Sequence, residues 1–189
     1  MSETLSRWHA EHANFAKLLD LLERQLIAFH CGGSPDYELM LEIMYYMTHY
    51  PDVLHHPKED LVFALIKERD ERAAGTVARL LEQHVLLKAS GAELVRELDG
   101  VVAGAIMSRE RIETTARSYL DEFRSHMRIE EGEILPLASR LLEPGDWQKI
   151  DAAIRQFEDP LFGARTEQRY AALASQIVRQ ESGAGAPAR

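Results

Sequence analysis

Two histidine–glutamate pairs recur with the same spacing in segments of helix-forming sequence. His55 precedes Glu59 by four residues, and His126 precedes Glu130 by four residues. Residues four apart on an α-helix lie on one face, one turn from each other, so each pair offers an imidazole and a carboxylate to one point. Imidazole and carboxylate are donors that suit iron, manganese or zinc. The spacing therefore predicts a metal site shared by two helices.

Three further histidines share the inward faces of the predicted helices. On a helical wheel of about 100° per residue, His12 and His84 fall among apolar neighbours, while His55 and His56 straddle the inward direction. Five imidazoles and two carboxylates then face one cavity: His12, His55, His56, Glu59, His84, His126 and Glu130. This set suits two metal ions bridged by two carboxylates.

Burial without a metal is the competing interpretation of these residues. A single inward histidine is more often a hydrogen-bonded core residue than a ligand. Burying two carboxylates together without a cation, however, costs several kcal/mol for each uncompensated charge, which favours metal. Pro57 leaves open whether the ring of His56 turns away from the site.

Some neighbouring residues are candidates for supporting roles. Lys88 follows His84 by one turn and is expected to face inward and pair with a ligand carboxylate or a tyrosine hydroxyl. Tyr45 is also expected to project inward. His9 is interpreted as a solvated residue at the rim, and of the acidic residues 130–133 only the first is assigned to the site.

The elements that must position these residues are helices, since amphipathic runs dominate and alternating strand patterns are absent. Pro51 and Pro57 predict a kink or a break in the second helix. Short connections favour an up-down-up-down four-helix bundle with additional C-terminal helices. The bundle helices are expected at residues 2–30, 34–69, 72–98 and 108–142, and the additional helices at 146–157 and 166–180. The predicted domains are a metal-binding bundle at 1–143, a helical extension at 144–181 and a disordered tail at 182–189.

The composition of the chain limits which binding partners and which cellular compartment are expected. The chain has 189 residues, and its net charge of −9 disfavours nucleic acid. No signal peptide and no membrane-spanning run of about 18 apolar residues is present, so no membrane association is expected. Cys31 is the only cysteine, which agrees with a cytoplasmic protein and excludes a thiolate zinc site.

The order H…HHxKED…H…HxxxE across four predicted helices resembles the hemerythrin family, in particular its HHE cation-binding branch, from about Leu5 to Leu142. The resemblance implies two iron ions bridged by Glu59 and Glu130. It also implies the division of the imidazoles, with one iron held by His12 and His55 and the other by His84, His126 and His56. Oxygen-carrying hemerythrins place a second histidine where this chain has Lys88, and Glu130 follows the bacterial i+4 spacing.

Function follows from this resemblance and from the excess of imidazole over carboxylate. Neutral imidazoles favour reversible binding, so we expect an iron protein that binds or senses O2, NO or peroxide, with manganese or zinc as substitutes. The alternatives are a di-iron enzyme acting on peroxide or NO, and an iron donor in iron–sulfur cluster repair. A further interpretation is a signalling module whose C-terminal helices contact a protein partner or form a homodimer. No catalytic residue is assigned.

Overall fold

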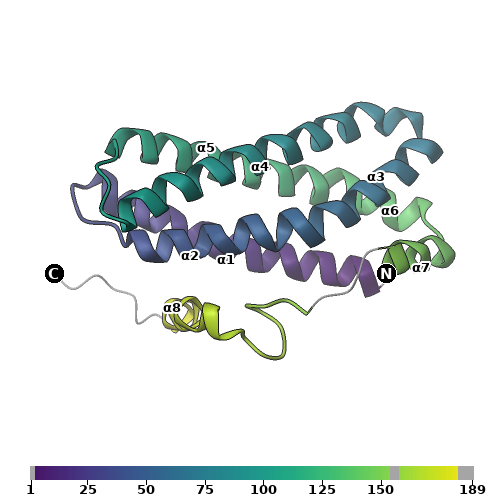
Figure 1. Ribbon diagram of the computed structural model, residues 1–189. Helices are drawn as coiled ribbons and strands as arrows, with labels where there is room; N and C mark the ends of the chain where they lie inside the picture. Colours follow the sequence, from purple (N-terminus) through teal and green to yellow (C-terminus); the bar gives the residue numbers. More distant parts are fainter. Residues whose placement is uncertain (1–2, 154–157, 183–189) are drawn as a thin grey trace.

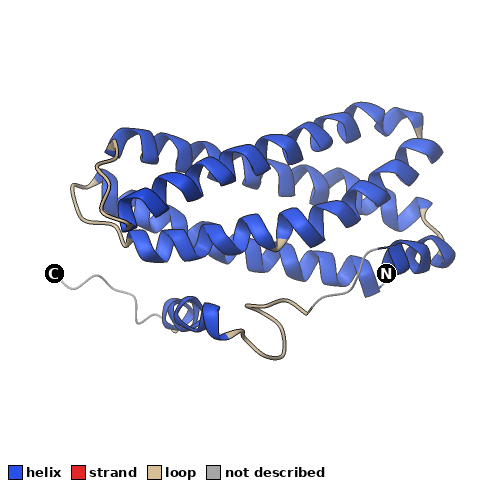
Figure 2. Ribbon diagram, viewed as in Figure 1, coloured by secondary structure: helices blue, strands red, loops and turns tan. Residues whose placement is uncertain are grey.

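Four helical rods form the body of the protein in the computed structural model, which describes residues 3–153 and 158–182. The rods lie side by side, and the chain runs up, down, up and down along them (Figure 1). No strand occurs within the described residues (Figure 2). The predicted all-α four-helix bundle is therefore confirmed. No helix in these ranges has the length and apolar character needed to cross a membrane.

Each rod combines one to three helical elements. The first rod is α1 (Glu3–His30), and the second joins α2 (Tyr37–His49), the π-helical turn η1 (Pro51–His55) and α3 (His56–Arg69). The third rod joins the 3-10 turn η2 (Glu71–Ala73) and α4 (Ala74–Val102). The fourth rod joins α5 (Arg109–Ile129), the π-helical turn η3 (Glu130–Ile134) and α6 (Leu135–Leu141).

Two helix ends differ from the sequence-based expectation. The second rod was predicted to begin at residue 34 but begins at Tyr37, because the side chain of Asp36 caps it by accepting from the amide of Leu39. The third helix was predicted to end at residue 98 but continues to Val102. Gly104, with φ of 85°, supplies the left-handed residue that ends this helix. The fourth helix begins close to its predicted start at residue 108, and the side chain of Ser108 caps α5 by accepting from the amide of Arg111.

Prolines in two rods are accommodated by π-helical turns rather than by breaks. In η1 the amide of His56 donates to the carbonyl of Pro51, one residue further back than in an α-helix. This wider turn leaves room for Pro57, which lacks an N–H and would clash with the carbonyl four residues earlier. Leu135 makes the same bond to Glu130 immediately before Pro136. The distortion near Pro51 and Pro57 was predicted, whereas the one at η3 was not.

The core is divided into two apolar clusters with a polar layer between them. Phe15 and Phe123 belong to one cluster, and Trp8 and Phe63 to the other. Phe15 of the first cluster and Trp8 of the second both contact the His55 ring edge-on. The histidines predicted to bind metal therefore lie where the two clusters meet.

The C-terminal part of the chain packs on the outside of the bundle. Helix α7 (Pro144–Ala153) replaces the helix predicted at 146–157, whose last four residues lie outside the described ranges. The helix predicted at 166–180 begins with the 3-10 turn η4 (Gln168–Tyr170) and continues as α8 (Ala171–Glu181). Helix α8 contacts α1 and α2. The predicted disordered tail lies almost entirely outside the described residues.

A close approach between rods at Gly91 gives a test of the packing. A Cβ atom at Gly91 would lie 2.9 Å from Cγ2 of Thr48 and 3.2 Å from Cε2 of Tyr119. Overpacking costs about 1–3 kcal/mol, against about 1 kcal/mol gained in helix propensity. We expect Gly91→Ala to lower the free energy of unfolding by about 1 kcal/mol in urea denaturation.

Gly75→Ala is the matched control, because a Cβ atom there meets nothing within 4 Å. It should stabilise the protein by up to about 1 kcal/mol. Equal effects of the two substitutions would contradict the close approach at Gly91.

Candidate metal centre

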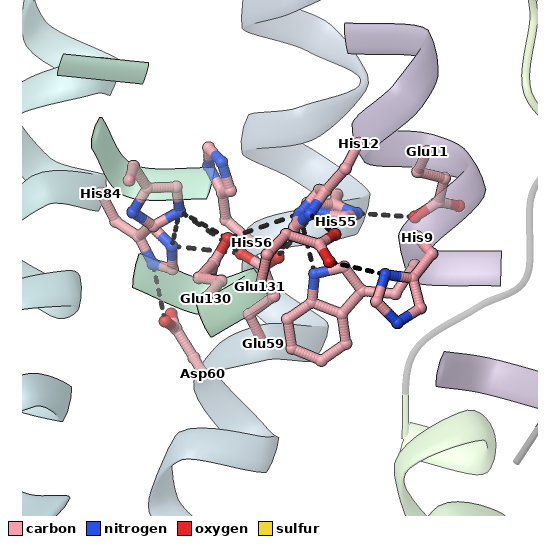
Figure 3. A network of polar contacts seen from close by, with 12 residues as sticks. His9, Glu11, His12, His55, His56, Glu59, Asp60, His84, Glu130 and Glu131 are labelled. Atoms are coloured by element: carbon pink, nitrogen blue, oxygen red, sulfur yellow. Dashed lines mark hydrogen bonds and ion pairs between the residues drawn. The ribbon is translucent and has the colours of Figure 1, made fainter. Parts of the chain in front are cut away.

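All seven residues predicted as ligands come together in the polar layer, and every one of them is buried. Figure 3 shows six of these side chains converging: His12, His55, His56, Glu59, His84 and Glu130. The seven residues come from α1 (His12), η1 (His55), α3 (His56 and Glu59), α4 (His84), α5 (His126) and the first position of η3 (Glu130). The donors could hold a metal in two groups that share Glu59.

The first group contains His12, His55 and Glu59, with donor atoms within 4.8 Å of one another. Nε2 of His12 lies 3.2 Å from Nε2 of His55. Oε1 of Glu59 lies 2.6 Å from Nε2 of His55 and 3.6 Å from Nε2 of His12. Two imidazoles and one carboxylate oxygen thus face a common point.

The second group contains His56, Glu59, His84 and His126. Nε2 of His84 lies 3.2 Å from Nε2 of His126 and 3.2 Å from Oε2 of Glu59. The ring of His56 stacks on that of His84 with centroids 4.3 Å apart. Pro57 therefore does not turn His56 away from the other three residues of this group.

Both carboxylates lie between the groups. Glu59 presents Oε1 to His55 and Oε2 to His84. Oε2 of Glu130 lies 3.4 Å from Nε2 of His12 and 3.3 Å from Nε2 of His126. Each glutamate is thus in reach of imidazoles from both sides, as a bridging ligand must be.

Several of these atoms lack a hydrogen bond, which tests whether a cation fits here. Nε2 of His56 and both carboxylate oxygens of Glu59 and of Glu130 are buried and make no hydrogen bond of acceptable geometry to any described residue. Oε1 of Glu59 nevertheless lies 2.6 Å from Nε2 of His55, and its Oε2 lies 3.2 Å from Nε2 of His84. Buried carboxylates left without hydrogen bonds are costly unless a cation is present, so the donor set fits metal ions.

Carboxylates outside the predicted set contact the Nδ1 atoms of four of the imidazoles. Nδ1 of His12 lies 2.7 Å from Glu131, and Nδ1 of His55 lies 2.6 Å from Glu11. The remaining two contacts are Nδ1 of His56 with Asp52 at 3.2 Å and Nδ1 of His84 with Asp60 at 2.8 Å. Such partners place the proton on Nδ1 and leave Nε2 free to bind a metal. Nδ1 of His126 has no partner among the described residues.

These outer carboxylates were missed by the sequence analysis, although one left a signal. Asp52 precedes His56 by four residues, the same spacing as in the two recognised pairs. Glu131 lies in the π-helical turn η3 and was not assigned to the site, yet it contacts both His12 and His9. Its side chain is partly exposed, so it lies at the edge of the buried layer.

Three other expectations meet different outcomes. Lys88 was predicted to face inward but is exposed, in an outer pocket beside Asp52 and His84. Tyr45 was also predicted to project inward, whereas its ring lies under the guanidinium of Arg169 at 4.4 Å. His9 is exposed, as predicted, and pairs with Glu131 at the rim.

Trp8 adds a hydrogen-bond donor that was not among the predicted site residues. Its indole N–H donates to Nε2 of His12 over 2.9 Å. Because Glu131 accepts from Nδ1 of the same ring, Nε2 of His12 carries the lone pair. The indole thus marks the atom through which His12 would bind a metal.

The carboxylates control the pKa values of the rings. Burial lowers the pKa of His55, but Glu59 and Glu11 outweigh burial and raise it to about 9. For His84, burial is outweighed by Asp60 and Glu59, which raise the pKa to about 10. Burial dominates at His56, whose pKa lies well below the ordinary value.

Glu59 responds in the opposite sense to the rings around it. Burial would raise its pKa, but His55 and His12 hold it well below the usual range. Glu59 is therefore an ionised carboxylate that requires positive charge beside it, either protons on the rings or a metal ion.

A comparison with protein families agrees with this geometry. The family model described as the hemerythrin HHE cation-binding domain matches residues 3–138. The match covers all four rods up to α6. No curated protein matches the chain.

The raised pKa values predict how stability depends on pH when metal is removed. In metal-free protein, protonated His55 and His84 contribute stability that is fully present below their ordinary pKa of 6.5 and is lost as pH rises through about 9 and about 10. A divalent cation replaces these protons and binds better as they leave.

Thermal unfolding measured across this pH range, with chelator or with Zn²⁺, checks the prediction. The chelated sample should lose stability with rising pH, and the gap between the two samples should widen. Parallel curves would contradict the exchange of protons for metal.

Proposed function

Because the chain belongs to the hemerythrin HHE cation-binding family, we propose that its polar layer holds two iron ions. His12 and His55 bind one ion, and His56, His84 and His126 bind the other. Glu59 and Glu130 bridge them. The observation that carries this proposal is Glu59, which directs one oxygen to each group of imidazoles.

The donor set favours iron without excluding close substitutes. Five imidazoles and two carboxylates also suit manganese or zinc by ligand type. Imidazole is neutral, so this set leaves a divalent pair less anionic than a carboxylate-rich cage would. The family supports a cation and favours iron among these metals.

The surroundings of the donors support binding of a small molecule rather than transformation of a large substrate. Phe15, Phe123 and Phe63 pack around the imidazoles and keep bulk water away. When bound, the iron pair would supply reversible coordination of O2, NO or peroxide. The indole N–H of Trp8 donates to Nε2 of His12. Among the described residues it is the only indole that contacts a predicted ligand. We therefore propose a protein that binds or senses such a molecule.

The alternative is a di-iron enzyme that acts on peroxide or NO, or an iron donor in cluster repair. A binding or sensing protein releases its ligand unchanged, whereas an enzyme converts it.

Metal content tests the ligand assignment. Wild-type protein purified from iron-replete cells should contain about two iron atoms per chain, since two groups of donors are present. Glu59→Gln and Glu130→Gln keep the side-chain volume but remove the bridging charge, and should lose most of the metal by elemental analysis. His56→Ala should lose about one of the two ions, because only the second group uses that ring.

Glu133→Ala is the control, since Glu133 is exposed and bonds to Thr76 rather than to a histidine. It should retain wild-type metal content, with far-UV circular dichroism confirming the fold of every variant. Metal retention in all four variants would remove the assignment.

A ligand-exchange experiment separates binder from enzyme. Reduced, iron-loaded protein exposed to O2, NO or peroxide should give an absorbance change that forms on mixing and reverses when the ligand is removed. The reason is the imidazole-rich, water-excluding environment. Sustained consumption of peroxide or NO over many turnovers would instead favour the enzyme.

A further inference from the structure

The C-terminal segment, residues 158–182, is docked on the bundle through one buried tyrosine. The hydroxyl of Tyr46 donates to Oδ2 of Asp159 over 2.8 Å. The Tyr46 ring also meets the rings of Phe162 and Tyr170 edge-on, at 5.9 and 5.8 Å. Tyr46 is fully buried, so these contacts depend on the segment being in place.

Asp159 also organises the start of the segment. Its Oδ1 accepts from the amides of Leu161 and Phe162, each over 2.9 Å. Leu161 and Leu173 are then buried in the larger apolar cluster. The carboxylate that accepts from Tyr46 therefore fixes the turn that leads to α8.

A second set of contacts begins at the metal centre and ends beside Tyr46. Nδ1 of His55 donates to Oε2 of Glu11 over 2.6 Å, and the hydroxyl of Tyr50 donates to Oε1 of the same carboxylate over 3.0 Å. The Tyr50 ring stacks on that of Tyr46, with centroids 5.5 Å apart and an interplanar angle of 19°. These five residues, His55–Glu11–Tyr50–Tyr46–Asp159, form a relay of direct contacts that joins the metal centre to the C-terminal segment.

We propose that metal loading and docking of the C-terminal segment are coupled through this relay. A metal on Nε2 of His55 fixes the ring and its Nδ1 proton, which in turn fixes Glu11 and Tyr50. The docked segment fixes the same tyrosine stack from the other end through Asp159. Metal binding and docking of the segment then each cost less conformational entropy once the other has occurred.

The coupling is reciprocal, because a segment that raises metal affinity must itself be held more tightly when metal is bound. It rests on the proposed metal centre and adds a role for residues beyond the part matched by the family model, which ends at 138. Tyr46 and Tyr50 act as positioning residues.

Hydrogen–deuterium exchange with Zn²⁺ as the probe tests the coupling. In wild-type protein, Zn²⁺ should slow exchange of the amides of Leu161, Phe162 and α8. Tyr46→Phe keeps the ring stack but removes the bond to Asp159, and should abolish this metal-dependent slowing. Losing one such bond should also weaken the apparent Zn²⁺ affinity by about five- to tenfold.

Tyr45→Phe is the matched control, since the Tyr45 ring packs under Arg169 outside the relay. It should behave as wild type in both measurements. Tyr50→Phe, which severs the relay at Glu11, should reproduce the effect of Tyr46→Phe.

The possible failures are distinguishable. A wild-type chain that binds no Zn²⁺ or iron overturns the proposed metal centre and this coupling with it. Normal metal binding with unchanged exchange in residues 158–182 overturns the coupling alone. Equal slowing in wild type and Tyr46→Phe, or an equal effect of Tyr45→Phe, overturns the relay as its route.

Discussion

Two glutamate side chains buried in the middle of an apolar bundle are the constraint around which this structure is arranged. Glu59 and Glu130 have exposures of 1% and 0%, and neither makes an acceptable hydrogen bond to a described residue. Their charge must be balanced within the layer, because the phenylalanines above and below cannot balance it. The imidazoles around them do so, and outer carboxylates orient four of the five, all except His126. The arrangement of these rings thus follows from burial of the glutamates.

The backbone adapts to this layer where prolines interrupt the ligand-bearing rods. Each π-helical turn contains one of the predicted ligands, since η1 ends at His55 and η3 begins at Glu130. A break at either place would have separated residues that must point to one site. A turn widened by one residue keeps the rod continuous and accommodates the proline ring. The local helix distortion is therefore part of how the donors are presented.

Much of the site could be predicted because the sequence patterns that indicate it lie within single helices. The i, i+4 pairs and the apolar faces placed all seven donors in one layer without any knowledge of neighbouring helices. Lys88 and Tyr45 were misplaced because a wheel gives a direction on one helix, whereas burial depends on what packs opposite. Glu11 and Glu131 were missed because each contacts a histidine from another element. The η3 turn was missed because Pro136 was not weighed as Pro57 was.

The dispersal of donors over all four rods ties the lifetime of the folded chain to metal supply. His12 and Glu130 are 118 residues apart by number, so the unfolded chain offers no comparable site. Metal therefore binds the native state selectively and stabilises it by about 4 kcal/mol when free metal is 1,000 times the dissociation constant. Proteases act on the unfolded fraction, which falls by about a thousandfold under that condition. Abundance of this protein in a cell should thus follow the availability of the ion it carries.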